Sequence, residues 1–284
     1  QVFEYHLEWG LTRFIAIFYG NDVVKVGPIR SGRIFDRHIM DMYNAILVFN
    51  GADKRVLEYF DEIDQNEDLF VVERECPPLC RDESFPPPHN LFGNTTLIHD
   101  YINGHLTENK RFDLATQYFY SLGAHGKDLV SRIYIDYSYA NYAYWDFDKH
   151  TNRYYRYQGS VDLLNGQEKV YTPLTDQLND QAIAADNVVV LFVPHEFYLK
   201  SSDTEIFEIN LVDRGDAYIF RNGKAYQATW ERREVNKPLY LLSPDGSNFP
   251  MKPGVTFFQI LHTTSQTIKD NQTWTFIFER PEEE

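Results

Sequence analysis

The chain of 284 residues has few cysteines, little positive charge and no long apolar segment, and each shortage excludes a class of protein. Its 27 lysines and arginines are outnumbered by 42 aspartates and glutamates, so the formal net charge is −15. This charge repels phosphate backbones and anionic membrane surfaces, so we do not expect nucleic acid as a partner. The longest apolar stretch, Val188 to Pro194, is far shorter than the roughly 18 residues that a membrane-spanning helix needs.

Common catalytic signatures are also missing. The sequence has no Gly-x-Ser-x-Gly, Ser-x-x-Lys or His-Glu-x-x-His motif, which are the usual marks of serine hydrolases and zinc proteases. We therefore expect neither a cofactor nor a resident metal, and we favour a binding protein over an enzyme.

The two cysteines, Cys76 and Cys80, lie in the sequence Cys-Pro-Pro-Leu-Cys. The two prolines restrict the backbone and hold a turn between the thiols, which suits a local disulfide. A second interpretation is half of a zinc site, but such a site needs two further ligands and only His89 is near in the sequence. A third interpretation is a pair of free thiols.

The first part of the chain alternates between strand-like and helix-like segments. Apolar spacing predicts strands at 13–19, 45–49 and 69–72 and helices at 34–43, 54–60 and 94–104. This order predicts an α/β layered domain with a largely parallel sheet. The segment 75–88 contains five prolines and both cysteines, so it is predicted to be a surface loop.

The second part changes to short β-rich runs separated by turn signals. The runs are 131–137, 142–147, 153–157, 187–193, 205–210, 217–221, 224–230 and 256–261. Asn222-Gly223 is a strong signal for a tight hairpin turn. We predict an α+β protein in which the α/β domain, residues 1–115, is followed by a mainly antiparallel β domain, residues 116–284.

Several motifs resemble those of the YerB-like lipoproteins of bacteria, a domain family of unknown function. They are residues 8–14 (EWGLTRF), 26–33 (VGPIRSGR), 44–48 (NAILV), 88–91 (PHNL), 186–190 (DNVVV) and 215–224 (GDAYIFRNGK). The resemblance implies an extracytoplasmic protein of two domains, lipid-anchored at the cell membrane through a segment upstream of Gln1. It implies no defined activity. An exported protein also favours the disulfide between Cys76 and Cys80.

An arginine cluster is the most informative candidate site. Arg30 and Arg33 flank a Ser-Gly pair just before the predicted helix at 34–43, and Arg13 lies in an earlier strand. Arginine forks and the free N–H groups of a helix start can together hold a carboxylate or phosphate. The alternative is that these arginines form internal ion pairs with the acidic residues Glu4, Glu8 or Asp36.

Ser31, between the two arginines, allows a catalytic alternative. A positive field favours its ionised hydroxyl, and His89 or Glu8 would be the base, although no sequence feature places either beside it. His89 and Asn90 follow three prolines, where their side chains either order the loop through backbone hydrogen bonds or contribute to a site.

Two further segments allow both a structural and a functional interpretation. Aromatic residues crowd the region 134–157, where they predict either cross-strand packing or, on alternate positions, an exposed platform for sugars or peptides. Asp146 and Asp148 with Asn152 resemble a fragment of a calcium loop, but a hairpin turn is the simpler interpretation.

These observations lead to one functional hypothesis and one alternative. We expect a non-enzymatic envelope lipoprotein that binds an anionic small molecule, a cell-wall component or an envelope protein. The expected ligand-binding residues are Arg13, Arg30, Ser31, Arg33, His89 and Asn90. The alternative is a hydrolase or transferase that acts on an envelope polymer, with Ser31, Glu8 and His89 as reacting groups.

Overall fold

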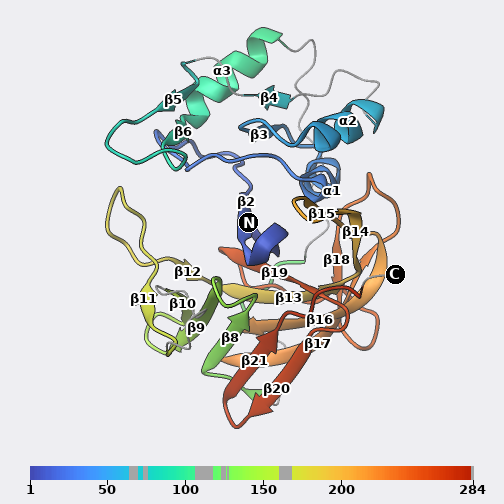
Figure 1. Ribbon diagram of the computed structural model, residues 1–284. Helices are drawn as coiled ribbons and strands as arrows, with labels where there is room; N and C mark the ends of the chain where they lie inside the picture. Colours follow the sequence, from blue (N-terminus) through green and yellow to red (C-terminus); the bar gives the residue numbers. More distant parts are fainter. Residues whose placement is uncertain are drawn as a thin grey trace. The chain divides into compact units, whose positions relative to one another are not determined.

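The computed structural model describes residues 1–63, 70–72, 76–105, 118–122, 126, 128–159 and 168–282, and it is mostly β (Figure 1). The chain divides into two compact units. Unit 1 comprises Gln1–Ala16 and Ala115–Glu284, and unit 2 comprises Ile17–Leu114. The boundary that the sequence predicts, near residue 115, lies outside the described residues. That prediction groups residues 1–16 with residues 17–115, whereas unit 1 joins residues 1–16 to the C-terminal part of the chain.

The larger sheet of unit 1 has eight strands in the order β18-β17-β16-β13-β19-β1-β2, with β7 paired to β17. The strands are β1 (Val2–His6), β2 (Thr12–Ala16), β7 (Asp128–Leu129), β13 (Asn187–Val193), β16 (Asp213–Arg221), β17 (Lys224–Arg232), β18 (Tyr240–Leu242) and β19 (Thr256–His262). The three central strands β1, β19 and β13 are parallel, whereas the other pairs are antiparallel. This sheet is therefore mixed, because both β13 and the N-terminal strand β1 pair with β19 in parallel.

The second sheet of unit 1 has seven strands in the order β11-β10-β9-β8-β21-β20, with β12 paired to β10. The strands are β8 (Arg132–Asp136), β9 (Tyr142–Asp148), β10 (Arg153–Gly159), β11 (Tyr171–Pro173), β12 (Ala184–Ala185), β20 (Gln266–Asp270) and β21 (Thr273–Ile277). A separate hairpin consists of β14 (His195–Lys200) and β15 (Glu205–Ile209), and a short 3-10 helix η1 (Glu8–Gly10) joins β1 to β2.

The core of unit 1 lies between these two sheets. One hydrophobic cluster combines Val188 and Val190 of β13 with Ile133 of β8, Trp145 of β9 and Phe276 of β21, all fully buried. Successive residues of a strand face opposite sides of the sheet, so each strand contributes alternate side chains to this core. Every residue of β13 and β19 is buried, which the apolar run 188–193 explains for β13, whereas β19 also buries the polar residues Thr256, Gln259 and His262.

Two turns of unit 1 confirm their sequence signals. Asn222 and Gly223 have positive φ values of 55° and 70° and join β16 to β17 in an antiparallel hairpin. Residues 149–152 join β9 to β10, and the Asp148 carboxylate accepts the backbone N–H of His150 at 2.6 Å. Asp146 pairs with Arg132 at 3.0 Å, so this segment is a hairpin turn with its acids already engaged.

Within its described residues, unit 2 contains three helices and two short strand pairs. They are α1 (Ile34–Tyr43), β3 (Leu47–Phe49), α2 (Lys54–Ile63), β4 (Phe70–Val72), β5 (Leu79–Arg81), β6 (Leu91–Gly93) and α3 (Thr95–His105). The helix predicted at 34–43 is confirmed, and its apolar stripe is buried. Parallel pairing is limited to β3 and β4 in the part of unit 2 that the structure describes, and β5 pairs antiparallel to β6. The strand predicted at 13–19 is β2, which pairs with β1 in unit 1.

Cys76 and Cys80 form a disulfide, which confirms that prediction and excludes free thiols and a zinc site. The bonded cysteines hold the turn that leads into β5, whose Cys80 lies opposite Phe92 of β6. The predicted loop at 75–88 therefore includes a short strand.

None of the helices that the structure describes combines the length and the apolar character needed to cross a membrane.

Candidate functional site

The segment before α1 is held in place by backbone hydrogen bonds on both sides. Ile29 N–H donates to Leu91 O at 2.8 Å, and Arg30 O accepts from Asn50 N–H at 2.9 Å. Gly32 N–H donates to Gly51 O at 2.9 Å. A side chain at position 32 would begin 2.9 Å from the Phe49 ring, so only glycine allows the segment to lie this close to β3. The loop that presents Arg30 is therefore ordered by its neighbours in unit 2.

Arg30 contacts the loop that carries His89. Its Nη1 lies 3.1 Å from both Pro88 O and His89 Nδ1. Guanidinium groups only donate, so His89 Nδ1 is the acceptor and the proton of the neutral ring lies on Nε2. His89 is exposed and Arg30 half-buried. Two residues 59 positions apart in the sequence thus form one polar surface with a cation and an outward imidazole N–H.

Arg33 has a different role from Arg30. It is the N-cap of α1, and its backbone N–H donates to the Asp36 carboxylate at 2.8 Å. Its guanidinium donates to Gly32 O at 2.9 Å and Ser31 O at 3.3 Å, so part of its donor capacity is used inside the loop.

A further acid lies in the field of Arg33. The pKa of Asp53 is lowered to about 2, chiefly by its side-chain hydrogen bond with Arg55, and the charge of Arg33 contributes a smaller part. The Asp53 carboxylate therefore stays ionised in all but strongly acidic solution, and it offsets some of the positive charge of Arg33.

The remaining sequence candidates divide between the units. Asn90 is buried beside His89, and its Oδ1 accepts Arg81 Nη1 at 2.9 Å. Arg13 lies in β2 and donates to Thr12 O at 3.3 Å, and Glu8 lies in η1. Unit 2 thus holds five of the predicted residues, namely Arg30, Ser31, Arg33, His89 and Asn90, whereas Arg13 and Glu8 belong to unit 1.

Ser31 is half-buried in the segment before α1. Within the described residues, its hydroxyl has no hydrogen bond to a histidine or a carboxylate. His89 Nδ1, which could otherwise act as a base, already accepts from Arg30.

An ion pair that sequence reasoning missed lies in the core of unit 1. Glu4, a predicted partner for the arginine cluster, pairs instead with Arg156 of β10. Arg156 Nη1 lies 2.9 Å from Glu4 Oε2, Nη2 donates to Oε1 at 3.0 Å, and both side chains are almost fully buried. The available signal was strand alternation, because Arg156 follows the inward-facing Tyr154 by two positions.

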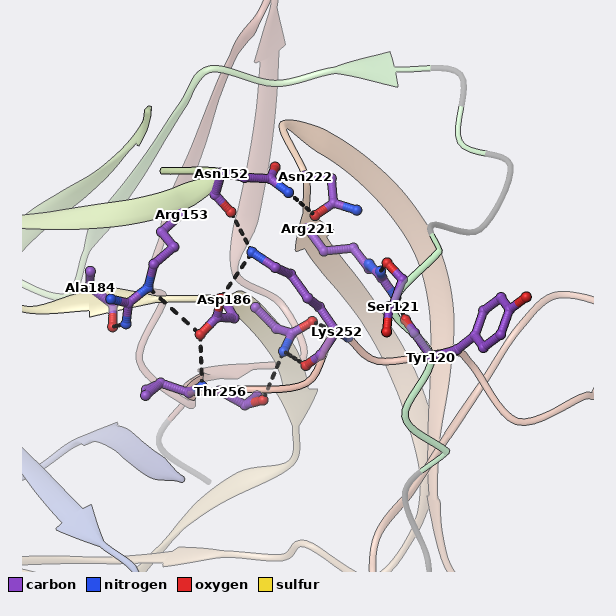
Figure 2. Close-up of polar contacts among 12 residues, drawn as sticks. Tyr120, Ser121, Asn152, Arg153, Ala184, Asp186, Arg221, Asn222, Lys252 and Thr256 are labelled. Atoms are coloured by element: carbon purple, nitrogen blue, oxygen red, sulfur yellow. Dashed lines mark hydrogen bonds and ion pairs between the residues drawn. The ribbon is translucent and has the colours of Figure 1, made fainter. Parts of the chain in front are cut away.

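Figure 2 shows a second network of unit 1 that sequence reasoning missed. Asp186, just before β13, accepts Val255 N–H at 3.0 Å and pairs with Lys252 at 2.9 Å and Arg153 at 3.7 Å. Lys252 also donates to Asn152 O, and Asn152 Nδ2 donates to Asn222 Oδ1 at 3.0 Å. Both oxygens of Asp186 have partners, so the network stabilises the strand ends rather than offering a vacant charge.

The predicted aromatic patch mixes buried and partly exposed rings. Tyr142, Trp145 and Tyr154 are buried in the core. Tyr144 and Tyr157, which are partly exposed, stack with their ring centroids 4.6 Å apart, and Arg132 lies over the Tyr144 ring. Cross-strand packing accounts for both sets.

Two family models match the chain. The N-terminal domain described as "Protein of unknown function (DUF3048)" matches residues 1–108, and its C-terminal domain matches residues 133–258. The chain belongs to the DUF3048 family. The family resemblance seen in the sequence motifs is confirmed.

A curated relative and a solved structure agree with this assignment. The chain is 24% identical over 275 residues to "Putative lipoprotein YerB" of Bacillus subtilis (strain 168), covering 92% of this chain and 74% of that protein. It is similar to the crystal structure of YerB from Bacillus subtilis with a TM-score of 0.72 and 21% identity, covering 92% of this chain and 82% of that one. At this identity the structural likeness establishes the fold.

Proposed function

We propose that this DUF3048 protein is a non-enzymatic envelope lipoprotein that binds an anionic ligand through Arg30 and His89. The ligand is the carboxylate or phosphate group of a cell-wall component. The observation that supports this most is the environment of Arg30. Among the described residues no carboxylate contacts Arg30, and only its Nη1 has a partner, so the other donors of the fork face no protein acceptor.

The chemistry of the surface suits an anion. A guanidinium binds carboxylate and phosphate through charge-assisted hydrogen bonds, which are roughly twice as strong as neutral ones. Because Arg30 already holds the Nδ1 side of His89, the Nε2–H group of the same ring is available as a second donor. The segment is ordered by backbone bonds before any ligand arrives, which limits the entropy lost on binding.

The proposed location rests on two observations. The relative from Bacillus subtilis carries the name "Putative lipoprotein YerB", and we extend a lipid anchor to this chain. The Cys76–Cys80 disulfide is typical of proteins that fold outside the reducing cytosol.

The test compares variants of Arg30 with a matched arginine elsewhere. Binding of inorganic phosphate, citrate and purified peptidoglycan is measured by calorimetry and co-sedimentation for wild type, Arg30→Lys, Arg30→Gln and the control Arg233→Gln. Arg233 is exposed and pairs with Glu231 in unit 1, so its loss removes the same charge without touching the site. We expect Arg30→Gln to lower affinity about tenfold or more, and Arg30→Lys to restore only part because it lacks the planar fork.

The thermal midpoint should hardly change in Arg30→Gln, since no buried acid loses its partner. Equal binding by wild type and Arg30→Gln, or no binding of any of these probes by wild type, would contradict the proposal.

A further inference from the structure

A pocket of about 300 Å³ lies in unit 1, outside the surface proposed above. It lies where the parallel strands β13 and β19 end: Phe192 is near the end of β13, Pro194 follows that strand, and Thr263 follows β19. Strand β16, which pairs with β13, and strand β17, which pairs with β16, supply the rest of its lining. This volume is at the lower end of the range for small-molecule sites.

Two opposite charges line this pocket. Arg214 and Asp216 both belong to β16 and are two positions apart, so their side chains leave the same face of the sheet. Both are exposed. Within the described residues neither forms an ion pair or a side-chain hydrogen bond, and Glu231, which lies opposite Arg214 on β17, pairs with Arg233 instead. The pocket thus holds one cation and one anion, and no ion pair engages either of them in the part of the chain that the structure describes.

Hydroxyl groups and an apolar wall complete the lining. Thr229 of β17 lies directly opposite Asp216, and Thr263 faces the pocket from the end of β19. Neither threonine side chain has a hydrogen bond to another described residue. Phe192, which is 8% exposed, and Pro194 provide the apolar part.

Gly215, between the two charged residues, keeps the wall of the pocket in place. A side chain at this position would begin 2.6 Å from Trp230 Nε1 and 2.8 Å from Phe192 O. The indole N–H of Trp230 instead donates to Phe192 O at 2.8 Å. This buried hydrogen bond joins β17 to β13 across β16, the strand that carries Arg214 and Asp216. Both charged side chains therefore extend from a well-ordered sheet.

We propose that this pocket binds a small zwitterion, either an amino acid or a short peptide, with Arg214 receiving the carboxylate and Asp216 the ammonium group. The two residues lie roughly 6.6 Å apart along the strand, which leaves room for a small ligand between their charged groups. The threonine hydroxyls and the apolar wall would contact the parts of the ligand that lie between and beside its two charged groups. This inference is independent of the Arg30 surface, which lies in the other unit and takes a simple anion.

The test uses four related probes and ligand-observed NMR on the full chain. Alanine and the dipeptide alanyl-alanine carry both charges, whereas N-acetylalanine lacks the ammonium group and alanine amide lacks the carboxylate. We expect saturation transfer to alanine or the dipeptide, with affinity at least about tenfold weaker for the two singly charged analogues. Binding of alanine indicates a free amino acid as the ligand, and binding of only the dipeptide indicates a peptide.

The variants Arg214→Gln and Asp216→Asn should each weaken zwitterion binding about tenfold or more. Lys149→Gln and Asp203→Asn remove one exposed charge of each sign elsewhere in unit 1 and should leave binding unchanged. All four positions are exposed, so tryptophan fluorescence should report a normal fold.

Three results would overturn the inference. The first is that neither alanine nor the dipeptide binds when present at about 50-fold excess over the protein, which would detect roughly millimolar affinity. The second is zwitterion binding that is unchanged in both pocket variants. The third is that N-acetylalanine binds as strongly as alanine. Arg30→Gln should not affect zwitterion binding, so this inference and the anion proposal fail separately.

Discussion

Arg156 in unit 1 and Arg30 in unit 2 show how the surroundings of one residue type decide its role. Arg156 is 1% exposed, bonds both oxygens of Glu4 and has the rings of Phe14 and Trp145 within 5.3 Å of its guanidinium. Arg30 is only half-buried and contacts a backbone carbonyl and a neutral imidazole. A charge taken out of water needs an opposite charge inside the protein, whereas a charge left in water remains available for a ligand.

The comparison predicts its largest effect at Arg156. Arg156→Gln leaves the Glu4 carboxylate buried without its cation, so the free energy of unfolding of unit 1 should fall by about 3–5 kcal/mol. Arg233→Gln, which removes an exposed arginine of the same unit, is the matched control and should change it by about 0.5 kcal/mol or less. Urea unfolding followed by tryptophan fluorescence measures this, since all four tryptophans lie in unit 1.

The double variant Glu4→Gln/Arg156→Met removes both charges and should recover part of the loss. Equal stability of Arg156→Gln and Arg233→Gln would show that the buried pair contributes nothing beyond an exposed arginine.

Acid should affect unit 1 before unit 2. Burial lowers the pKa of His6 to about 3, with the charge of Arg280 adding to the effect, and burial likewise lowers the pKa of His195 to about 3. Their folded pKa values lie below the unfolded value near 6.5, so the unfolded chain binds more protons, and stability is full above about pH 7 and falls as the pH drops toward 3. At pH 5 each histidine should cost about 2 kcal/mol.

Unit 2 should lose stability in the same direction but only at lower pH. The lowered pKa of Asp53 contributes stability that is present above pH 4 and is lost only as the pH falls from about 4 to about 2. Unfolding curves at pH 7 and pH 5 measure the difference for unit 1. His6→Phe, which keeps an aromatic ring against Phe278, should remove about half of the pH dependence, whereas His150→Gln at an exposed turn should not. A tryptophan unfolding curve that is unchanged between pH 7 and pH 5 would disprove this.

The smallest expected effect concerns the disulfide of unit 2. It closes a loop of only five residues, so the chain-entropy relation predicts a loss of about 2 kcal/mol when Cys76 and Cys80 are both replaced by serine. Hydrogen exchange of β5 and β6 amides should report this loss, while the tryptophan unfolding curve of unit 1 should not move. A shift in unit 1 of the same size would mean that the two units unfold together.

Local patterns predicted several elements correctly. The helix Ile34–Tyr43 follows from apolar spacing, the β16–β17 hairpin from Asn222-Gly223, and the Cys76–Cys80 bond from two cysteines close in sequence with prolines between them, together with the family resemblance. The contact between Arg30 and the His89 loop is consistent with the predicted site, since the family motifs include both segments.

The sequence by itself determined the features that depend on neighbouring residues. These are turn conformation, the buried faces of helices and strands, and a short disulfide loop. The tertiary structure alone decided which distant segments meet. It placed β1 and β2 in unit 1, with Arg13 on β2, and it joined Glu4 to Arg156 across 152 positions. The physical reason is that strand pairing depends on burying complementary surfaces from remote segments, and the alternation of apolar and polar residues tells which face is inward without telling which strand lies beside it.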